Sequence, residues 1–78
     1  MSHDDKLVRM ANDIGRFFAA QGEARAVEGI ATHLRKFWTP RMRAEIIAHV
    51  EHGGAGLDDL PRRAVARLAA ASAAAAAA

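Results

Sequence analysis

The sequence predicts an all-α fold, a small bundle of four short helices. Apolar residues recur at helical spacing from Leu7 onward, and no stretch alternates as a half-buried strand would. Helix stop and start signals divide the chain at Gln21-Gly22, at Thr39-Pro40 and at Gly53-Gly54-Ala55-Gly56. Alanine, the strongest helix former, supplies 20 of the 78 residues.

The first helix is expected to begin where Ser2 and Asp5 resemble a capping box, and to end at Gln21-Gly22. We assign Phe17 and Phe18 to its core-facing side, together with Leu7, Met10, Ala11 and Ile14. A second stripe of small residues either lets another backbone approach closely or is merely tolerated on the surface. That stripe consists of Val8, Ala11, Gly15 and Ala19.

The second helix is expected at Glu23–Phe37, with Ile30 and Leu34 in the core. Its apolar face is expected to consist of Val27, Ile30, Ala31, Leu34 and Phe37. The third helix is expected from Pro40 to about His52. Thr39 can accept a hydrogen bond as its N-cap, and proline suits the first helical position because it has no N–H to leave unpaired. Its predicted inward residues are Met42, Ile46 and Val50, with Ile47 on the flank.

The fourth helix is expected to begin at Asp58 or Asp59, with Pro61 in its first turn, where proline is tolerated. Its narrow apolar face consists of Leu57, Ala64, Val65 and Leu68. We therefore expect residues 1–68 to form a single helical domain. Residues 69–78, almost all alanine, are expected to be a C-terminal tail or an extension of this helix.

The core of such a chain is small. Half of its forty hydrophobic residues are alanine, and a chain of this length buries only roughly 60% of its unfolded surface. Without cysteine it can form no disulfide or thiolate metal site. This composition indicates a bundle that is stabilised by docking on a larger protein.

The net charge of +2, from eleven basic and nine acidic residues, is far from the excess of a dedicated nucleic-acid-binding protein. No run of large apolar residues is long enough to span a membrane. The acidic N-terminus lacks the apolar segment of a signal peptide. We therefore expect a cytoplasmic protein with no nucleic-acid or membrane partner.

Glu45, His49 and His52 share one side of the third helix, a spacing that metal ligands can have. Histidines near a helix C-terminus have a plainer explanation, because their charged form complements the helix dipole. No phosphate-binding loop or activated nucleophile accompanies them. We expect no catalytic, cofactor-binding or metal-binding residue in this chain.

The stretch between the second and third helices, which we call the basic corner, is the strongest candidate for an interface. Residues 33–43 contain the only tryptophan and four basic residues but no acidic residue. Tryptophan and arginine are enriched where proteins bind each other. The predicted interface residues are Phe37, Trp38, Arg41 and Arg43, flanked by Arg35 and Lys36.

Three interpretations of the basic corner stay open. It could dock on an acidic or phosphate-bearing protein surface, or Trp38 could be buried in the bundle beneath a solvated basic edge. A small nucleic-acid-binding module is the alternative, although Glu28, Glu45 and Glu51 interrupt any basic stripe.

Three segments resemble the delta subunit of soluble NAD-dependent formate dehydrogenases. They are residues 7–18 (LVRMANDIGRFF), residues 29–43 (GIATHLRKFWTPRMR) and residues 53–57 (GGAGL). The resemblance covers roughly Asp5 to Leu68, and residues 37–43 are its most specific part. The alanine tail matches no part of the pattern.

The resemblance implies a non-catalytic accessory subunit of a cytoplasmic formate dehydrogenase complex, which is an oxidoreductase. It implies that this chain stabilises the catalytic alpha subunit or assists its assembly, alongside beta and gamma subunits. It also implies that those partners, and not this chain, carry the cofactors. The implied cofactors are bis-molybdopterin guanine dinucleotide with molybdenum (or tungsten), iron–sulfur clusters and FMN.

Overall fold

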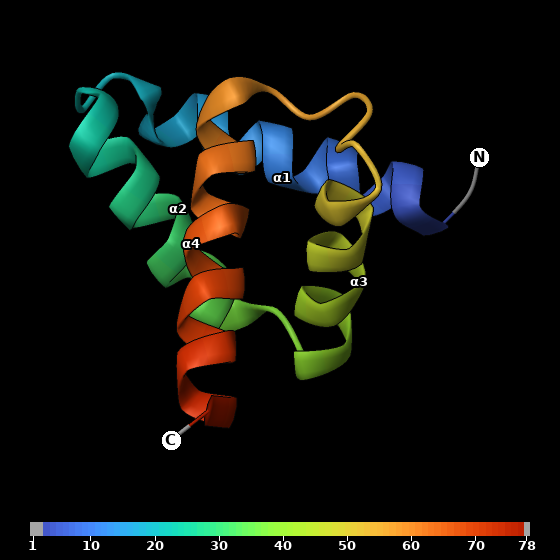
Figure 1. Cartoon of the computed structure of the whole chain (residues 1–78). Coiled ribbons are helices and arrows are strands. Elements are labelled where there is room, and N and C mark those ends of the chain that lie inside the picture. Colours follow the sequence, from blue (N-terminus) through green and yellow to red (C-terminus); the bar gives the residue numbers. More distant parts are fainter. Residues whose placement is uncertain (1–2, 78) are drawn as a thin grey trace.

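A computed structural model describes residues 3–77, and this part of the chain folds into four helices without a strand. They are α1 (His3–Ala19), α2 (Glu23–Phe37), α3 (Pro40–Glu51) and α4 (Asp59–Ala77) (Figure 1). This confirms the predicted all-α class. Ser2, half of the predicted capping box, lies outside the described residues.

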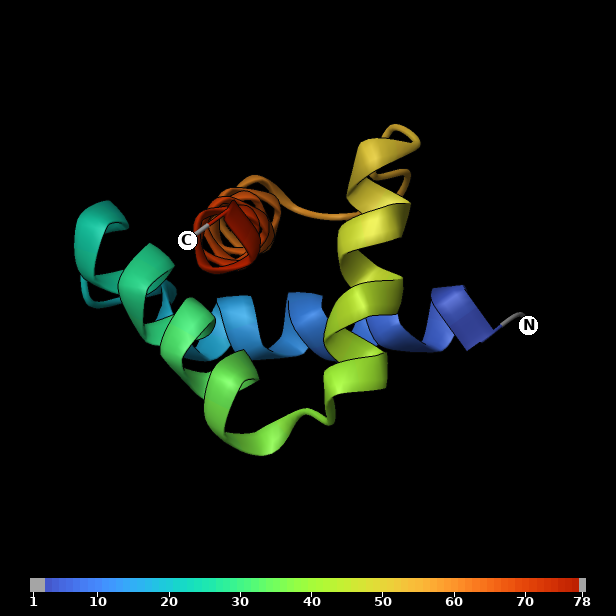
Figure 2. The same cartoon turned by 60° about the horizontal axis from the view of Figure 1, so that its bottom comes forward.

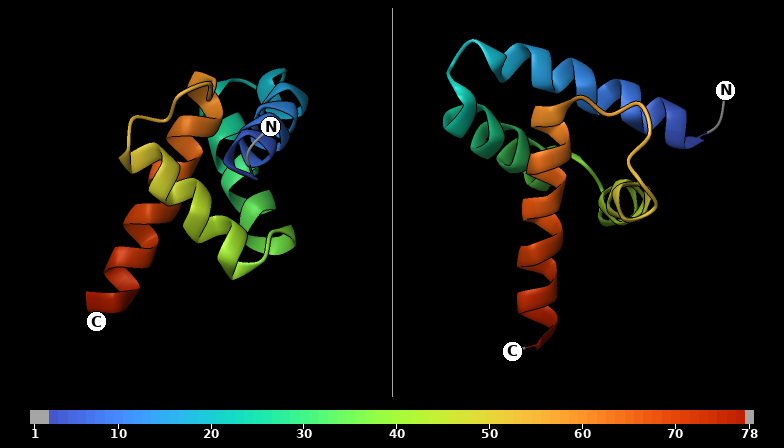
Figure 3. Two further views of the ribbon diagram at one scale, coloured as in Figure 1. Left: turned by 90° about the vertical axis from the view of Figure 1, so that its right-hand side faces the viewer. Right: turned by 45° about the horizontal axis from the view of Figure 1, so that its top comes forward.

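The helices cross one another at steep angles. Helix α1 runs across one end of the molecule, and α2, α3 and α4 extend away from it (Figure 1). Figure 2 shows how steeply α3 crosses α1. Helix α2 packs against both α1 and α4, while α3 packs against α1 and α4. The last turns of α4 project beyond the other helices (Figure 3), so residues 69–77 continue this helix.

The predicted stripe of small residues on α1 does permit a close approach. Val8, Ala11 and Gly15 are buried, whereas Ala19 is exposed. A Cβ atom added to Gly15 would lie 3.0 Å from the ring carbons of Pro61, which is tighter than normal van der Waals contact. Gly15 therefore lets the first turn of α4 rest directly on α1.

The predicted boundary between α2 and α3 is confirmed in detail. Thr39 is the N-cap of α3, and its hydroxyl accepts a hydrogen bond of 3.1 Å from the backbone N–H of Met42. Pro40 occupies the start of α3. Trp38 ends α2 in an extended conformation, with φ −89° and ψ 144°. Local sequence signals thus specify where α2 ends and α3 begins.

The loop between α3 and α4 relies on glycine and on one arginine. Gly53 and Gly54 have φ values of 111° and 65°, which residues with a side chain rarely adopt. The Arg62 guanidinium folds back from α4 and donates hydrogen bonds of 3.2 Å to the carbonyl oxygens of both glycines. The loop is therefore held against α4.

Asn12 joins this loop to α1 and is the buried polar residue of the core, with 9% of its surface exposed. Its Nδ2 donates a 2.9 Å hydrogen bond to the Gly56 carbonyl oxygen. Its Oδ1 accepts a 2.9 Å bond from the backbone N–H of Asp58, just before α4. A single side chain amide thus fixes α1 to the point where α4 starts.

The hydrophobic core lies where the helices converge, and most of its residues were expected. Ile30, Leu34 and Ile46 are fully buried. The assignment of Phe17 to the core and of Phe37 to the apolar face of α2 is wrong, because they are 75% and 71% exposed. Phe18 is only half-buried. The other main core residues are Leu7, Val8, Ala11, Val27, Ala31, Trp38, Leu57, Ala64, Val65 and Leu68.

Candidate interaction surface

The structure divides the predicted interface residues of the basic corner into buried and exposed groups. The Trp38 side chain is only 5% exposed and packs in the core. Its neighbour Phe37 is 71% exposed. Trp38 is therefore buried beneath the corner, and Phe37 is the aromatic side chain that the corner exposes.

Arg43 has an internal role that its sequence context did not reveal. From the first turns of α3, its Nη1 donates hydrogen bonds to the carbonyl oxygens of Trp38 (2.6 Å) and Arg35 (3.1 Å), with Leu34 O at 3.5 Å. The last carbonyl groups of a helix have no partner within that helix. Arg43 therefore caps the C-terminus of α2 and locks the angle between α2 and α3.

We expect replacement of Arg43 by methionine to lower the free energy of unfolding by about 1–2 kcal/mol. Methionine keeps much of the aliphatic stem but removes the donors to the α2 carbonyl groups. The matched control is Arg41→Met, because the Arg41 side chain is 89% exposed and its one ion pair within residues 3–77 is with Glu45. That change should lower the free energy of unfolding by less than about 0.5 kcal/mol. Urea titration monitored by Trp38 fluorescence measures the free energy of unfolding of both variants. Equal losses in the two variants would contradict the capping role.

The remaining cations of the corner face solvent. Arg35 is exposed, and its Nη2 lies 3.4 Å from the Thr32 hydroxyl oxygen. Arg41 pairs with Glu45, one turn further along α3. Lys36 is exposed beside Phe37. Four of the six predicted interface residues, Arg35, Lys36, Phe37 and Arg41, are thus available to a partner.

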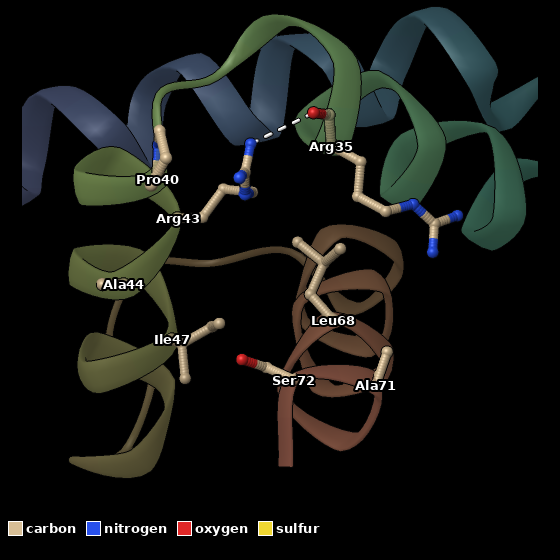
Figure 4. Close-up of a pocket in the computed structure, with 8 residues that line it drawn as sticks. All are labelled: Arg35, Pro40, Arg43, Ala44, Ile47, Leu68, Ala71 and Ser72. Atoms are coloured by element: carbon tan, nitrogen blue, oxygen red, sulfur yellow. Dashed lines mark hydrogen bonds between the residues drawn. The ribbon is translucent and has the colours of Figure 1, made fainter. Parts of the chain in front are cut away.

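A groove of about 360 Å³ lies between α3 and α4, below the basic corner (Figure 4). Ile47 and Leu68 form its apolar walls, and Ser72 lies further along α4. Arg35 and Arg43 stand at the end nearest α2. The Arg43 guanidinium is bound to the carbonyl groups at the end of α2. Its positive charge therefore lies at this end of the groove.

The histidine pair of α3 is occupied by backbone contacts. His49 Nε2 lies 2.8 Å from the Ala55 carbonyl oxygen, and His52 Nδ1 lies 2.7 Å from the Ala48 carbonyl oxygen. Glu45, the third residue of the pattern, pairs with Arg41 and with His3. Within residues 3–77 no group of three or more histidine, aspartate or glutamate side chains could hold a metal ion.

Comparisons with known proteins identify the family. No curated protein and no solved structure matches this chain significantly. Among the described residues, no helix is both long enough and apolar enough to cross a membrane. A family model described as NADH-dependent formate dehydrogenase delta subunit FdsD matches residues 6–65. The match includes most of α1, all of α2 and α3, and the first turns of α4, but not the alanine-rich end. The chain therefore belongs to the family of formate dehydrogenase delta subunits.

Proposed function

We propose that this chain is a non-catalytic accessory subunit of a cytoplasmic, NAD-dependent formate dehydrogenase complex. In this proposal it binds the catalytic alpha subunit, in a complex that also contains beta and gamma subunits. Binding stabilises that subunit or assists its assembly. The molybdenum (or tungsten) cofactor, the iron–sulfur clusters and FMN belong to the partner subunits.

The family assignment supports the proposal that the chain is part of a formate dehydrogenase complex. The exposed phenylalanines support the proposal that it acts by binding another protein. Phe17 and Phe37 are the large hydrophobic residues that residues 3–77 leave exposed, at 75% and 71%. Aromatic residues are enriched in protein interfaces, where they bury a large area.

Deletion of this subunit from the producing cell tests the proposal. We expect the remaining complex to contain less molybdenum per alpha subunit and to oxidise formate more slowly. Both deficits should disappear when the chain is expressed again. Metal analysis, size-exclusion chromatography and formate oxidation by the purified complex measure the three quantities. Unchanged assembly, metal occupancy and activity would reject the accessory role.

A further inference from the structure

Aromatic rings form a continuous row across α1 and α2, and the rings at its two ends are exposed. The Phe17 and Phe18 rings meet edge to face, with centroids 5.2 Å apart. The Phe18 centroid lies 6.3 Å from that of His33 on α2, and the His33 and Phe37 centroids are 4.7 Å apart. We call these four side chains, Phe17, Phe18, His33 and Phe37, the aromatic row.

The aromatic row depends on a glycine in the middle of α2. A Cβ atom added to Gly29 would lie 2.6 Å from Cδ1 of Phe18, so glycine at this position lets the ring approach α2 this closely. Glycine inside a helix costs about 1 kcal/mol relative to alanine. A hollow of about 270 Å³ opens beside the row, and Thr32 and Lys36 complete its lining.

Two exposed cations of α2 lie, around the helix axis, on the side next to the aromatic row. Among residues 3–77, neither Arg25 nor Lys36 makes an ion pair, and both are exposed. With about 100° between successive helical residues, Lys36 lies about 20° from Arg25 around the axis of α2, and His33 lies about 80° from it. Glu28 lies about 60° away on the opposite side. The cations thus stand between the aromatic row and the nearest carboxylate of α2.

We propose that the aromatic row is the surface by which this chain docks on the catalytic subunit, and that it fits an apolar groove there whose rim carries carboxylates. This assignment rests on the proposed function. A second copy of the chain fits less well, because a two-fold interface would bring each patch against itself. The unpaired charges on both sides would then be positive.

The apolar half of the proposal is tested with the complex purified from cells that lack this subunit. Phe17→Ala and Phe37→Ala chains are titrated against that complex, and dissociation constants are compared with the unaltered chain. We expect each substitution to weaken binding by about 30-fold or more, the effect of removing a central interface side chain. Circular dichroism should show unchanged folding, because both rings are exposed.

The charge half is tested with the double variant Arg25→Glu/Lys36→Glu. We expect binding to weaken about tenfold or more at low salt, with a smaller loss as salt rises, because salt screens exposed charges. The matched control, Arg9→Glu/Arg67→Glu, reverses two exposed cations on α1 and α4 and should change binding less than about threefold. An equal loss of binding affinity in both double variants would contradict the proposal that carboxylates line the rim of the partner's groove.

The outcomes separate this assignment from the function on which it rests. Failure of the unaltered chain to bind the depleted complex would refute the proposed function. Tight binding by the unaltered chain and by both phenylalanine variants would refute only the assignment of the aromatic row. A concentration-dependent dimer of the isolated chain, abolished by Phe37→Ala, would place a second copy on the row and also overturn the proposal.

Discussion

Trp38→Ala is expected to unfold the isolated chain. The side chain is 5% exposed in the core between the helices, and removal of a buried tryptophan side chain costs about 3–5 kcal/mol. A single core in a chain of this size rarely supplies more than about 3–5 kcal/mol in total. Circular dichroism at 222 nm should therefore show loss of helix at 25 °C, without denaturant.

The control for this variant is the adjacent residue. Phe37→Ala removes a ring that is 71% exposed and should change the free energy of unfolding by less than about 0.5 kcal/mol. Trp38→Phe, which keeps much of the apolar volume, should leave the chain folded but less stable. A Trp38→Ala chain that melts cooperatively within a few degrees of the unaltered chain would contradict the burial of this side chain.

Asn12→Leu is expected to lower the free energy of unfolding by about 2–4 kcal/mol. Leucine has the same number of side-chain heavy atoms and the same branching at Cγ, but it removes the donor to Gly56 O and the acceptor for Asp58 N–H. Each backbone group left without a partner in a buried position costs about 1–3 kcal/mol. Urea denaturation followed by Trp38 fluorescence gives the difference directly.

Asp13→Ala provides the comparison for Asn12, because it alters the next residue on α1 at a solvated position. Asp13 pairs with Arg16, and both side chains are more than half exposed. Loss of that pair should change stability by less than about 0.5 kcal/mol. Similar losses in Asn12→Leu and Asp13→Ala would mean that the two buried hydrogen bonds contribute little.

The sequence predicted the helices well because their boundaries depend on neighbouring residues. The pair Thr39-Pro40 specifies the start of α3 through one hydroxyl and one ring. Glycines at positions 53 and 54 specify a turn through their positive φ values. Helical periodicity then placed most of the core, including Ile30, Leu34 and Ile46.

The side chains at the corner were harder to predict, because their directions depend on the backbone between the helices. Phe37 still has helical geometry and points outward, whereas Trp38 is extended and points into the core. The sequence places both residues at the same turn and does not indicate which of the two side chains is buried. The role of Arg43 depends on the angle between α2 and α3, and no residue pattern in the sequence predicts that angle.

The aromatic row and the Asn12 bridge were missed for a related reason, since each joins parts of the chain that tertiary packing brings together. Phe17 follows the apolar period of α1, and only the crossing of α1 and α2 leaves it outside the core. Asn12 lies beside the buried Ala11 and near the buried Gly15. A lone amide among such residues was the one available signal of a buried hydrogen-bonding role.

The hydrogen bonds that organise this molecule differ in the length of chain that must close to form them. Arg43 reaches carbonyl groups five to nine residues away, whereas Asn12 reaches groups 44 and 46 residues away. The entropy lost on closing a loop grows with its length, and local contacts form sooner. The angle between α2 and α3 should therefore form early in folding, and the joining of α1 to the start of α4 should complete the native state.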